Sequence, residues 1–195
     1  MAKVLVVTSS PKRDSISTYL AAEFANMLKT DDVEFFDLTS IDFPVYDEKL
    51  LQKFEMPNSP STEESEFYDD LLKQFMDADR IVFAIPNWNL MCPPSMVYYL
   101  LCVCRTGVTF RYTDTGHEGL LKGKKAVIIA TCGGEYVENQ SYFGTTWLKS
   151  ALALNGITDV QEVVAELIEV RRDEQDMIKQ EALEKLSEIS KTFLD

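Results

Sequence analysis

The stretch that decides the fold is "KVLVVTSSPKRDSIST", residues 3–18. Its first half, Lys3–Thr8, is a short run of aliphatic and β-branched residues, which predicts a buried strand. Its second half carries four serines within nine residues and no glycine. Apolar residues then recur every three or four positions over residues 20–28, which predicts a helix. The chain therefore opens with a strand, a loop rich in hydroxyl groups, and a helix.

The rest of the chain repeats this alternation. Four further apolar runs predict strands at Val33–Leu38, Arg80–Ile85, Lys125–Thr131 and residues 158–165. Helical patterns lie around Glu66–Met76 and Met96–Cys104, and a last apolar stripe runs from Ile178 to Phe193. Five strands separated by helices predict one α/β domain over residues 1–195. We expect a three-layer sandwich, in which a five-stranded parallel sheet has helices on both faces.

A long polar stretch separates the second predicted strand from the third. It contains Pro44, Pro57 and Pro60. Because proline lacks the backbone N–H and interrupts regular elements, we expect an irregular excursion before the helix around Glu66–Met76.

The composition is that of an acidic, globular protein, with 46% hydrophobic residues and a net charge of −13. This charge argues against nucleic acid as a partner. No apolar stretch reaches the roughly 18 residues that span a bilayer, and the N-terminus lacks the apolar core of a signal peptide. We therefore expect a cytoplasmic protein without a membrane segment. Cys92, Cys102, Cys104 and Cys132 form no CxxC pair and have a single histidine to join them, so we interpret them as buried apolar side chains rather than metal ligands.

Three loops of unusual composition follow predicted strands: Thr8–Ser17, Pro86–Ser95 and Thr131–Tyr136. In a parallel α/β sheet, ligands bind outside the carboxyl ends of the strands. The same edge of the sheet would carry all three loops, which predicts a ligand site there.

The first loop suits a phosphate group. Hydroxyl groups and free backbone N–H groups bind anions, and the N-terminus of the following helix adds a positive partial charge. Ser15 or Ser17 also suits simple capping of that helix. No glycine occurs before Gly107, which excludes a dinucleotide-binding GxGxxG turn, and the P-loop and GxSxG motifs are absent. A monophosphate ligand fits what remains, and flavin mononucleotide (FMN) is the leading candidate.

The second loop, "IPNWNLMCPPS", suits a flat ligand with a polar edge. Trp88 and Leu90 can pack against an aromatic ring system, while Asn87 and Asn89 can bond to its edge. The alternative is a surface turn in which asparagine serves for its conformational tolerance.

The third loop places Gly133 and Gly134 after the fourth predicted strand. Adjacent glycines let the backbone approach a ligand closely and direct N–H donors at it. Near the pyrimidine end of a flavin, such donors stabilise negative charge. An ordinary tight turn is the alternative.

These loops resemble those of a known family, the FMN-dependent NADH-azoreductases, which are quinone-reductase-like proteins once called acyl-carrier-protein phosphodiesterases. The resemblance extends along almost the whole chain and is most specific over "RTGVTFRYTDTGHEGLLKGKKAVIIATCGG", residues 105–134. It implies a flavodoxin-like fold. It also implies a set of FMN contacts: Ser10, Ser15, Ile16 and Ser17 at the phosphate, then Pro86, Asn87, Trp88, Asn89, Leu90, Thr131, Cys132, Gly133, Gly134 and Tyr136 around the ring.

Four of these positions depart from the family pattern. Trp88 replaces a tyrosine, and Leu90 replaces an aromatic residue that forms part of the pocket wall. Cys132 stands where many members have arginine, and Tyr136 where many have histidine. We expect FMN binding to survive these changes, with an altered preference for the electron acceptor.

The resemblance implies a two-step reaction. NADH or NADPH reduces the flavin and leaves, and the flavin then passes two electrons to a quinone, an azo compound or a nitroaromatic compound. NADH is favoured because no basic pair near the loops awaits a 2′-phosphate. The flavin carries the chemistry, so we assign no catalytic acid or base, and Tyr136 only a tuning role. The family forms homodimers, and the segment Met96–Cys104, apolar on all sides, suits either burial or a subunit interface.

Two other classes stay open. A flavodoxin-like electron carrier would bind FMN without oxidising NADH. A degenerate member would bind flavin weakly or not at all and act through protein contacts.

Overall fold

The structure is a computed structural model that describes residues 2–43, 47–55, 63–136 and 143–195. Its elements are, in chain order, β1 (Val4–Thr8), α1 (Ile16–Met27), β2 (Val33–Asp37), the 3-10 turn η1 (Leu38–Ser40), α2 (Glu48–Glu55), α3 (Glu63–Asp77), β3 (Arg80–Pro86), α4 (Pro94–Val103), β4 (Phe110–Thr113), β5 (Gly116–Gly119), β6 (Lys125–Thr131), α5 (Phe143–Leu154), β7 (Asp159–Ala165), η2 (Arg172–Glu174) and α6 (Gln175–Ser190).

Five strands form one parallel sheet in the order β2-β1-β3-β6-β7. These are the five strands that the sequence predicts, with bounds that agree within one residue at either end. In the middle of the sheet, Val6 pairs with Phe35 of β2 on one side and with Val82 of β3 on the other. The chain moves outward from β1 in both directions, so the strand order reverses between β1 and β3. This reversal opens a crevice at the carboxyl edge of the sheet.

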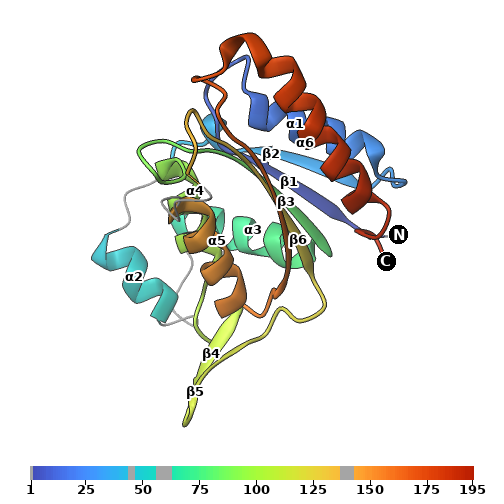
Figure 1. The fold of residues 1–195 in the computed structure, drawn as a ribbon. Helices are drawn as coiled ribbons and strands as arrows, with labels where there is room; N and C mark the ends of the chain where they lie inside the picture. Colours follow the sequence, from blue (N-terminus) through green and yellow to red (C-terminus); the bar gives the residue numbers. More distant parts are fainter. Residues whose placement is uncertain (1, 44–46, 56–62, 137–142) are drawn as a thin grey trace.

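The side chains of each central strand alternate between two hydrophobic cores. Leu5 and Val7 belong to one core, and Val4 and Val6 to the other; all four are fully buried. The first core packs against α3, α4 and α5, and the second against α1 and α6, which lie side by side on the opposite face (Figure 1). The predicted flavodoxin-like sandwich with helices on both faces is therefore confirmed.

The prediction of an irregular excursion is wrong for residues 48–55, which form α2. Leu50 and Phe54 lie one helical turn apart and pack on the first core, with Leu50 buried. In the sequence, the surrounding charged residues obscure the amphipathic spacing of these two side chains. Pro44, Pro57 and Pro60 lie outside the described residues. No bounds were predicted for α5, whose alanine, glycine and threonine content makes its pattern weak.

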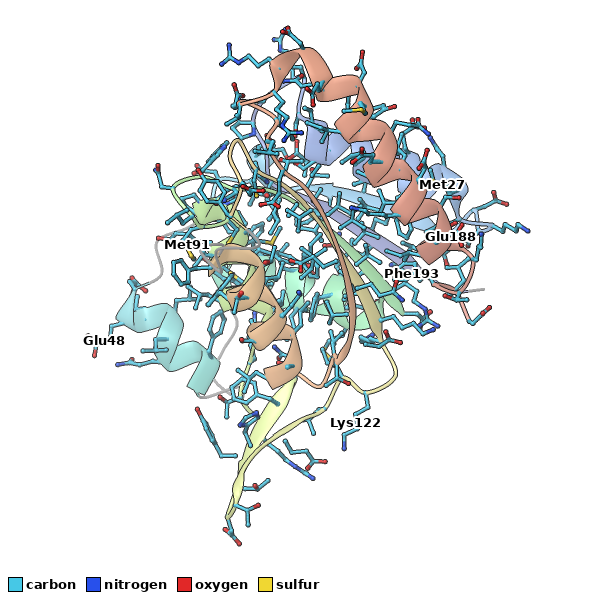
Figure 2. The ribbon with its side chains drawn as sticks, viewed as in Figure 1. Met27, Glu48, Met91, Lys122, Glu188 and Phe193 are labelled. Atoms are coloured by element: carbon cyan, nitrogen blue, oxygen red, sulfur yellow. The ribbon has the colours of Figure 1, made fainter. Side chains whose placement is uncertain are left out.

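The C-terminal end of the chain is fixed to the amino edge of the sheet. Arg80, at the start of β3, is buried, and its Nε donates to the carbonyl oxygen of Phe193 at 2.6 Å. A second nitrogen of its guanidinium donates to the carbonyl oxygen of Asp195, also at 2.6 Å. The Phe193 ring packs on that of Phe24 with centroids 5.4 Å apart. Figure 2 shows Phe193 on the opposite side of the molecule from Met91, which follows β3 at the carboxyl edge. These contacts hold α6 along α1.

Among the described residues, no helix is both long and apolar enough to cross a membrane.

The β4–β5 hairpin is held by a close approach of two backbones. Gly119, at the end of β5, lies against Gly156 in the turn between α5 and β7, and a Cβ at position 119 would lie 2.1 Å from the Gly156 nitrogen. Next to this contact, the N–H of Leu121 donates to the carbonyl oxygen of Asn155 at 2.8 Å. Only glycine fits where two backbones meet at this distance.

We predict that Gly119→Ala destabilises the fold by at least about 3 kcal/mol, because backbone atoms must move to admit the methyl group. Gly123→Ala is the matched control. Gly123 has a φ of +86° with open space around its Cβ position, so its substitution adds only backbone strain of about 1–2 kcal/mol. Urea unfolding of both variants measures the difference. Equal losses of stability would contradict the close-approach explanation.

Candidate functional site

A hollow of about 390 Å³ lies at the carboxyl edge of the sheet, over the crevice between β1 and β3. Its lining comes from the loops after β1, β3, β6 and β7 and from the start of α6. The lining residues are Ser10, Lys12, Asp14, Ser15, Ile16, Pro86, Asn87, Trp88, Thr131, Cys132, Gly133, Ile168, Glu169, Gln175 and Lys179. Nine of the fourteen residues proposed from sequence as cofactor contacts are among them. The other five, Ser17, Asn89, Leu90, Gly134 and Tyr136, are not.

The serines of the first loop have separate roles. Ser9 is buried, and its hydroxyl donates to the carbonyl oxygen of Ala84 at 3.0 Å, which ties the loop to β3. Ser10 and Ile16 line the hollow. The Ser10 hydroxyl accepts from the N–H of Lys12 at 3.4 Å, so the loop folds around it.

Ser15 begins α1 as its N-cap. Its hydroxyl accepts from the Thr18 N–H at 3.3 Å and lies 3.1 Å from the hydroxyl of Ser17, which is fully buried behind it. The capping alternative therefore holds for Ser15, but this residue also lines the hollow. A helix N-terminus with a lining hydroxyl provides N–H and O–H donors for an anion.

The second loop contains a two-residue turn. The backbones of Trp88 and Met91 exchange hydrogen bonds at 2.8 and 3.0 Å. Between them, Asn89 and Leu90 have φ values of 51° and 69°. The conformational tolerance of asparagine thus explains Asn89, whereas the same conformation strains Leu90 by about 1–3 kcal/mol. Asn87 and Trp88 line the hollow, whereas Asn89 and Leu90 are not among its lining residues.

Asn87 carries an unsatisfied acceptor. Its backbone N–H donates to the carbonyl oxygen of Thr131 at 2.8 Å, and its side-chain nitrogen lies 3.6 Å from the sulfur of Cys132. Its Oδ1 is buried and has no hydrogen-bond partner among the described residues. A buried acceptor without a donor costs about 1–3 kcal/mol, so this oxygen is a candidate partner for a ligand N–H.

The third loop, after β6, is held by the loop after β7, which the sequence analysis did not identify as part of the site. The carbonyl oxygens of Cys132, Gly133 and Gly134 accept from the backbone N–H groups of residues 167–170 at 3.1–3.2 Å. Leu167, with a φ of 64°, turns the chain so that these N–H groups converge. Because the C=O and N–H of a trans peptide point in opposite directions, the N–H groups of Gly133 and Gly134 point away from residues 167–170. Of these two glycines, Gly133 lines the hollow.

Tyr136 turns back over the glycines rather than into the hollow. Its N–H donates to the Oε1 of Glu166 at 2.6 Å. A Cβ at Gly134 would lie 3.1 Å from the phenol oxygen, so the ring covers this glycine. The position suits support of the loop, and a tuning role for Tyr136 stays a prediction.

The model of a protein family described as having a flavodoxin-like fold matches residues 2–189 of this sequence. The chain belongs to that flavodoxin-like family.

Individual relatives agree with this membership. The FMN-dependent NADH:quinone oxidoreductase of Caldicellulosiruptor saccharolyticus is 34% identical over 207 residues, which cover 99% of this chain and 100% of the relative. The structure is similar to that of an azoreductase from Bacillus anthracis, with a TM-score of 0.90, 27% identity and coverage of 99% and 100% of the two chains. It is also similar to an FMN-dependent NADH-azoreductase from the same species in complex with FMN, with a TM-score of 0.89, 25% identity and full coverage of both chains.

In this flavodoxin-like chain, the lining residues missed from the sequence come from the loop after β7 and from α6: Ile168, Glu169, Gln175 and Lys179. They lie more than 30 residues beyond the last loop that the strand-end rule selected. The loop after the fifth strand also lies at the carboxyl end of a strand. The rule that ligands bind at these ends therefore applies to this loop as well, and it was the signal that could have identified these residues. Lys12 and Asp14 are both exposed and also line the hollow.

The four thiols of this flavodoxin-like protein are free. Cys92, Cys102 and Cys132 are buried as predicted, while Cys104 is only partly buried. Burial raises the pKa of Cys92 and Cys104 to about 11 and that of Cys102 and Cys132 to about 12. Within the described parts of the chain, no group of three or more His, Cys, Asp or Glu side chains could hold a metal ion.

We predict that Ellman's reagent modifies fewer than one of the four thiols per native chain within minutes at pH 8, and all four after unfolding in guanidinium. A thiol with a pKa near 11 is about one part in a thousand thiolate at this pH, and only the thiolate reacts. Reactivity should rise as the pH approaches 11. A thiol that is modified rapidly in the native protein would contradict the burial of these side chains. If the rapid reaction disappears in Cys132→Ser, the reactive thiol is the one that lines the hollow.

Proposed function

We propose that this protein is an FMN-dependent NADH:quinone oxidoreductase and azoreductase, built as one FMN-binding domain over residues 1–195. One observation carries the proposal: a single hollow combines a serine-lined helix N-terminus with the backbone of Gly133, whose peptide is held from behind by the loop after β7. The first suits a phosphate, and the second suits the oxygen-bearing edge of a flat ring. The relatives bearing these activities in their names support the same assignment.

The residues fit FMN at both ends. At the phosphate end, Ser10 and Ser15 offer hydroxyl groups, and α1 offers its first N–H groups. At the ring end, Asn87 offers the unsatisfied acceptor and Trp88 a flat apolar surface. Such a mixed set of donors, an acceptor and an aromatic wall gives the ligand one orientation.

When bound, FMN supplies the redox chemistry by taking a hydride from NADH and passing two electrons to a quinone, an azo compound or a nitroaromatic compound. The chain's own groups bind and orient. The N–H group of Gly133 supplies positive partial charge at a fixed position, because the carbonyl oxygen of the same peptide accepts from the N–H of Ile168.

The test is the visible spectrum of the protein reconstituted with FMN and then given NADH without oxygen. We expect bound-flavin bands that bleach with NADH and return when a quinone is added. Bands that stay oxidised with NADH would favour a flavodoxin-like electron carrier. Failure to bind FMN would reject the cofactor and favour a protein that acts through contacts with other proteins.

We also propose a cytoplasmic homodimer that forms through the α4–α5 face. Leu101 and Phe143 expose 42% and 56% of their surfaces there. Between the two helices, a groove of about 330 Å³ is lined by Leu101, Trp147 and Leu154, among others. A contiguous exposed apolar surface of this kind is typical of an interface between subunits. The four free thiols suit the reducing conditions of the cytoplasm.

We predict that Leu101→Glu converts the dimer to a monomer, because a buried unpaired carboxylate opposes association. Analytical ultracentrifugation at micromolar concentration measures the change. Met177→Glu is the control: Met177 is 51% exposed on α6, which covers the other face of the sheet, and its substitution should leave the dimer intact. A monomeric unsubstituted protein, or a dimeric Leu101→Glu variant, would reject the interface.

A further inference from the structure

The start of α6 covers the phosphate end of the hollow. Gln175 and Lys179 both line the hollow and lie one helical turn apart, so they occupy the same face of α6. Further along this face, Ala182 and Leu186 are buried in the core that α6 shares with α1. The packing that fixes α6 on α1 therefore also fixes where Lys179 lies relative to the first loop.

Lys179 is held in place by two neighbours. Its Nζ lies 2.5 Å from Oδ1 of Asp176 and 6.0 Å from the centre of the Tyr19 ring on α1. The Tyr19 N–H in turn donates to the carbonyl oxygen of Ser15 at 2.9 Å, in the first turn of α1. Lys179 thus stands beside the same helix start that offers its N–H groups to the hollow.

The two members of the Lys179–Asp176 pair differ in exposure. The Lys179 side chain is 29% exposed, whereas that of Asp176 is 97% exposed. An ion pair with a fully hydrated carboxylate contributes little stability, so the lysine can exchange this partner for a better one at small cost. A phosphate dianion at the start of α1 would be a better partner, because charge-assisted hydrogen bonds to phosphate strengthen where water is partly excluded.

The charged side chains around the hollow are compatible with a phosphate-binding role for Lys179. The acidic side chains that line it are Asp14 and Glu169, and Glu169 is already paired with Arg172, whose nitrogen lies 2.6 Å from its Oε2. The basic side chains that line it are Lys12 and Lys179. Lys12 is exposed on the loop itself, whereas Lys179 is positioned by a packed helix. The chain has a net charge of −13, so a cation held in place at an anion site offsets the repulsion of the anionic ligand.

We propose that Lys179 is a binding residue for the phosphate of the flavin, its Nζ leaving Asp176 to pair with the phosphate oxygens. This inference rests on the proposed FMN site. It makes α6 part of the cofactor site and assigns to Lys179 a share of the preference for FMN over riboflavin, which has the same ring system without the phosphate.

The experiment compares the dissociation constants of FMN and riboflavin, measured by quenching of flavin fluorescence, for the unsubstituted protein and for Lys179→Met. We expect FMN to bind about tenfold more weakly to the variant, since one hydrogen bond to a charged group is lost. Riboflavin binding should change less than about twofold, because the ring contacts are untouched. Added salt should weaken FMN binding less in the variant than in the unsubstituted protein.

Two further variants complete the comparison. Lys185→Met removes an exposed lysine from the same helix and should leave both dissociation constants unchanged. Lys179→Arg keeps the charge and should retain most of the FMN affinity, which separates a charge effect from damage to the packing of α6.

The inference is overturned if Lys179→Met binds FMN as tightly as the unsubstituted protein does, which leaves the proposed function standing. It is also overturned if FMN and riboflavin lose affinity equally, since that would indicate a structural effect. If the unsubstituted protein binds neither flavin, the inference and the proposed function fail together.

Discussion

The constraint on which the structure depends is the burial of β1 on both faces between two parallel neighbours. Val4–Val7 have no exposed side, so helices must cover both faces of the sheet. The chain leaves β1 toward β2 on one side and later returns to place β3 on the other. This reversal of direction keeps the crossover helices apart at the carboxyl edge. The hollow that carries the candidate site exists because of that separation.

Most of the polar groups proposed for the site are backbone groups held from behind. Backbone N–H groups of the loop after β7 donate to the carbonyl oxygens of Cys132, Gly133 and Gly134, and these hydrogen bonds orient the peptides. The loop after β1 is tied to β3 by Ser9, and α1 begins with a side-chain cap on Ser15. Dipoles fixed in this way need little rearrangement when a ligand arrives, so their electrostatic effect is available at once.

The charge distribution is consistent with such a site. A chain of net charge −13 repels anions at long range, yet it is proposed to bind a phosphate. Helix N-termini and N–H groups supply local positive potential without changing the net charge. A lysine from α6 adds a cation at the same point, and its present partner, Asp176, is 97% exposed and therefore hydrated.

The sequence by itself determined the five strands of the parallel sheet, the helices with strong apolar periodicity and three loops of the site, because burial on a sheet or helix face leaves a local pattern. That is why Lys125–Thr131 was predicted with its observed bounds. The sequence did not predict the hairpin of β4 and β5. It did not reveal α2, whose two core contacts are spaced among charges, or the turn in which Asn89 and Leu90 have positive φ values. Only the tertiary structure decided that residues 167–170 orient the glycine peptides and that Lys179 lies beside the start of α1. Both results depend on how α6 and the loop after β7 pack against segments distant in sequence, and such packing leaves no local periodicity to read.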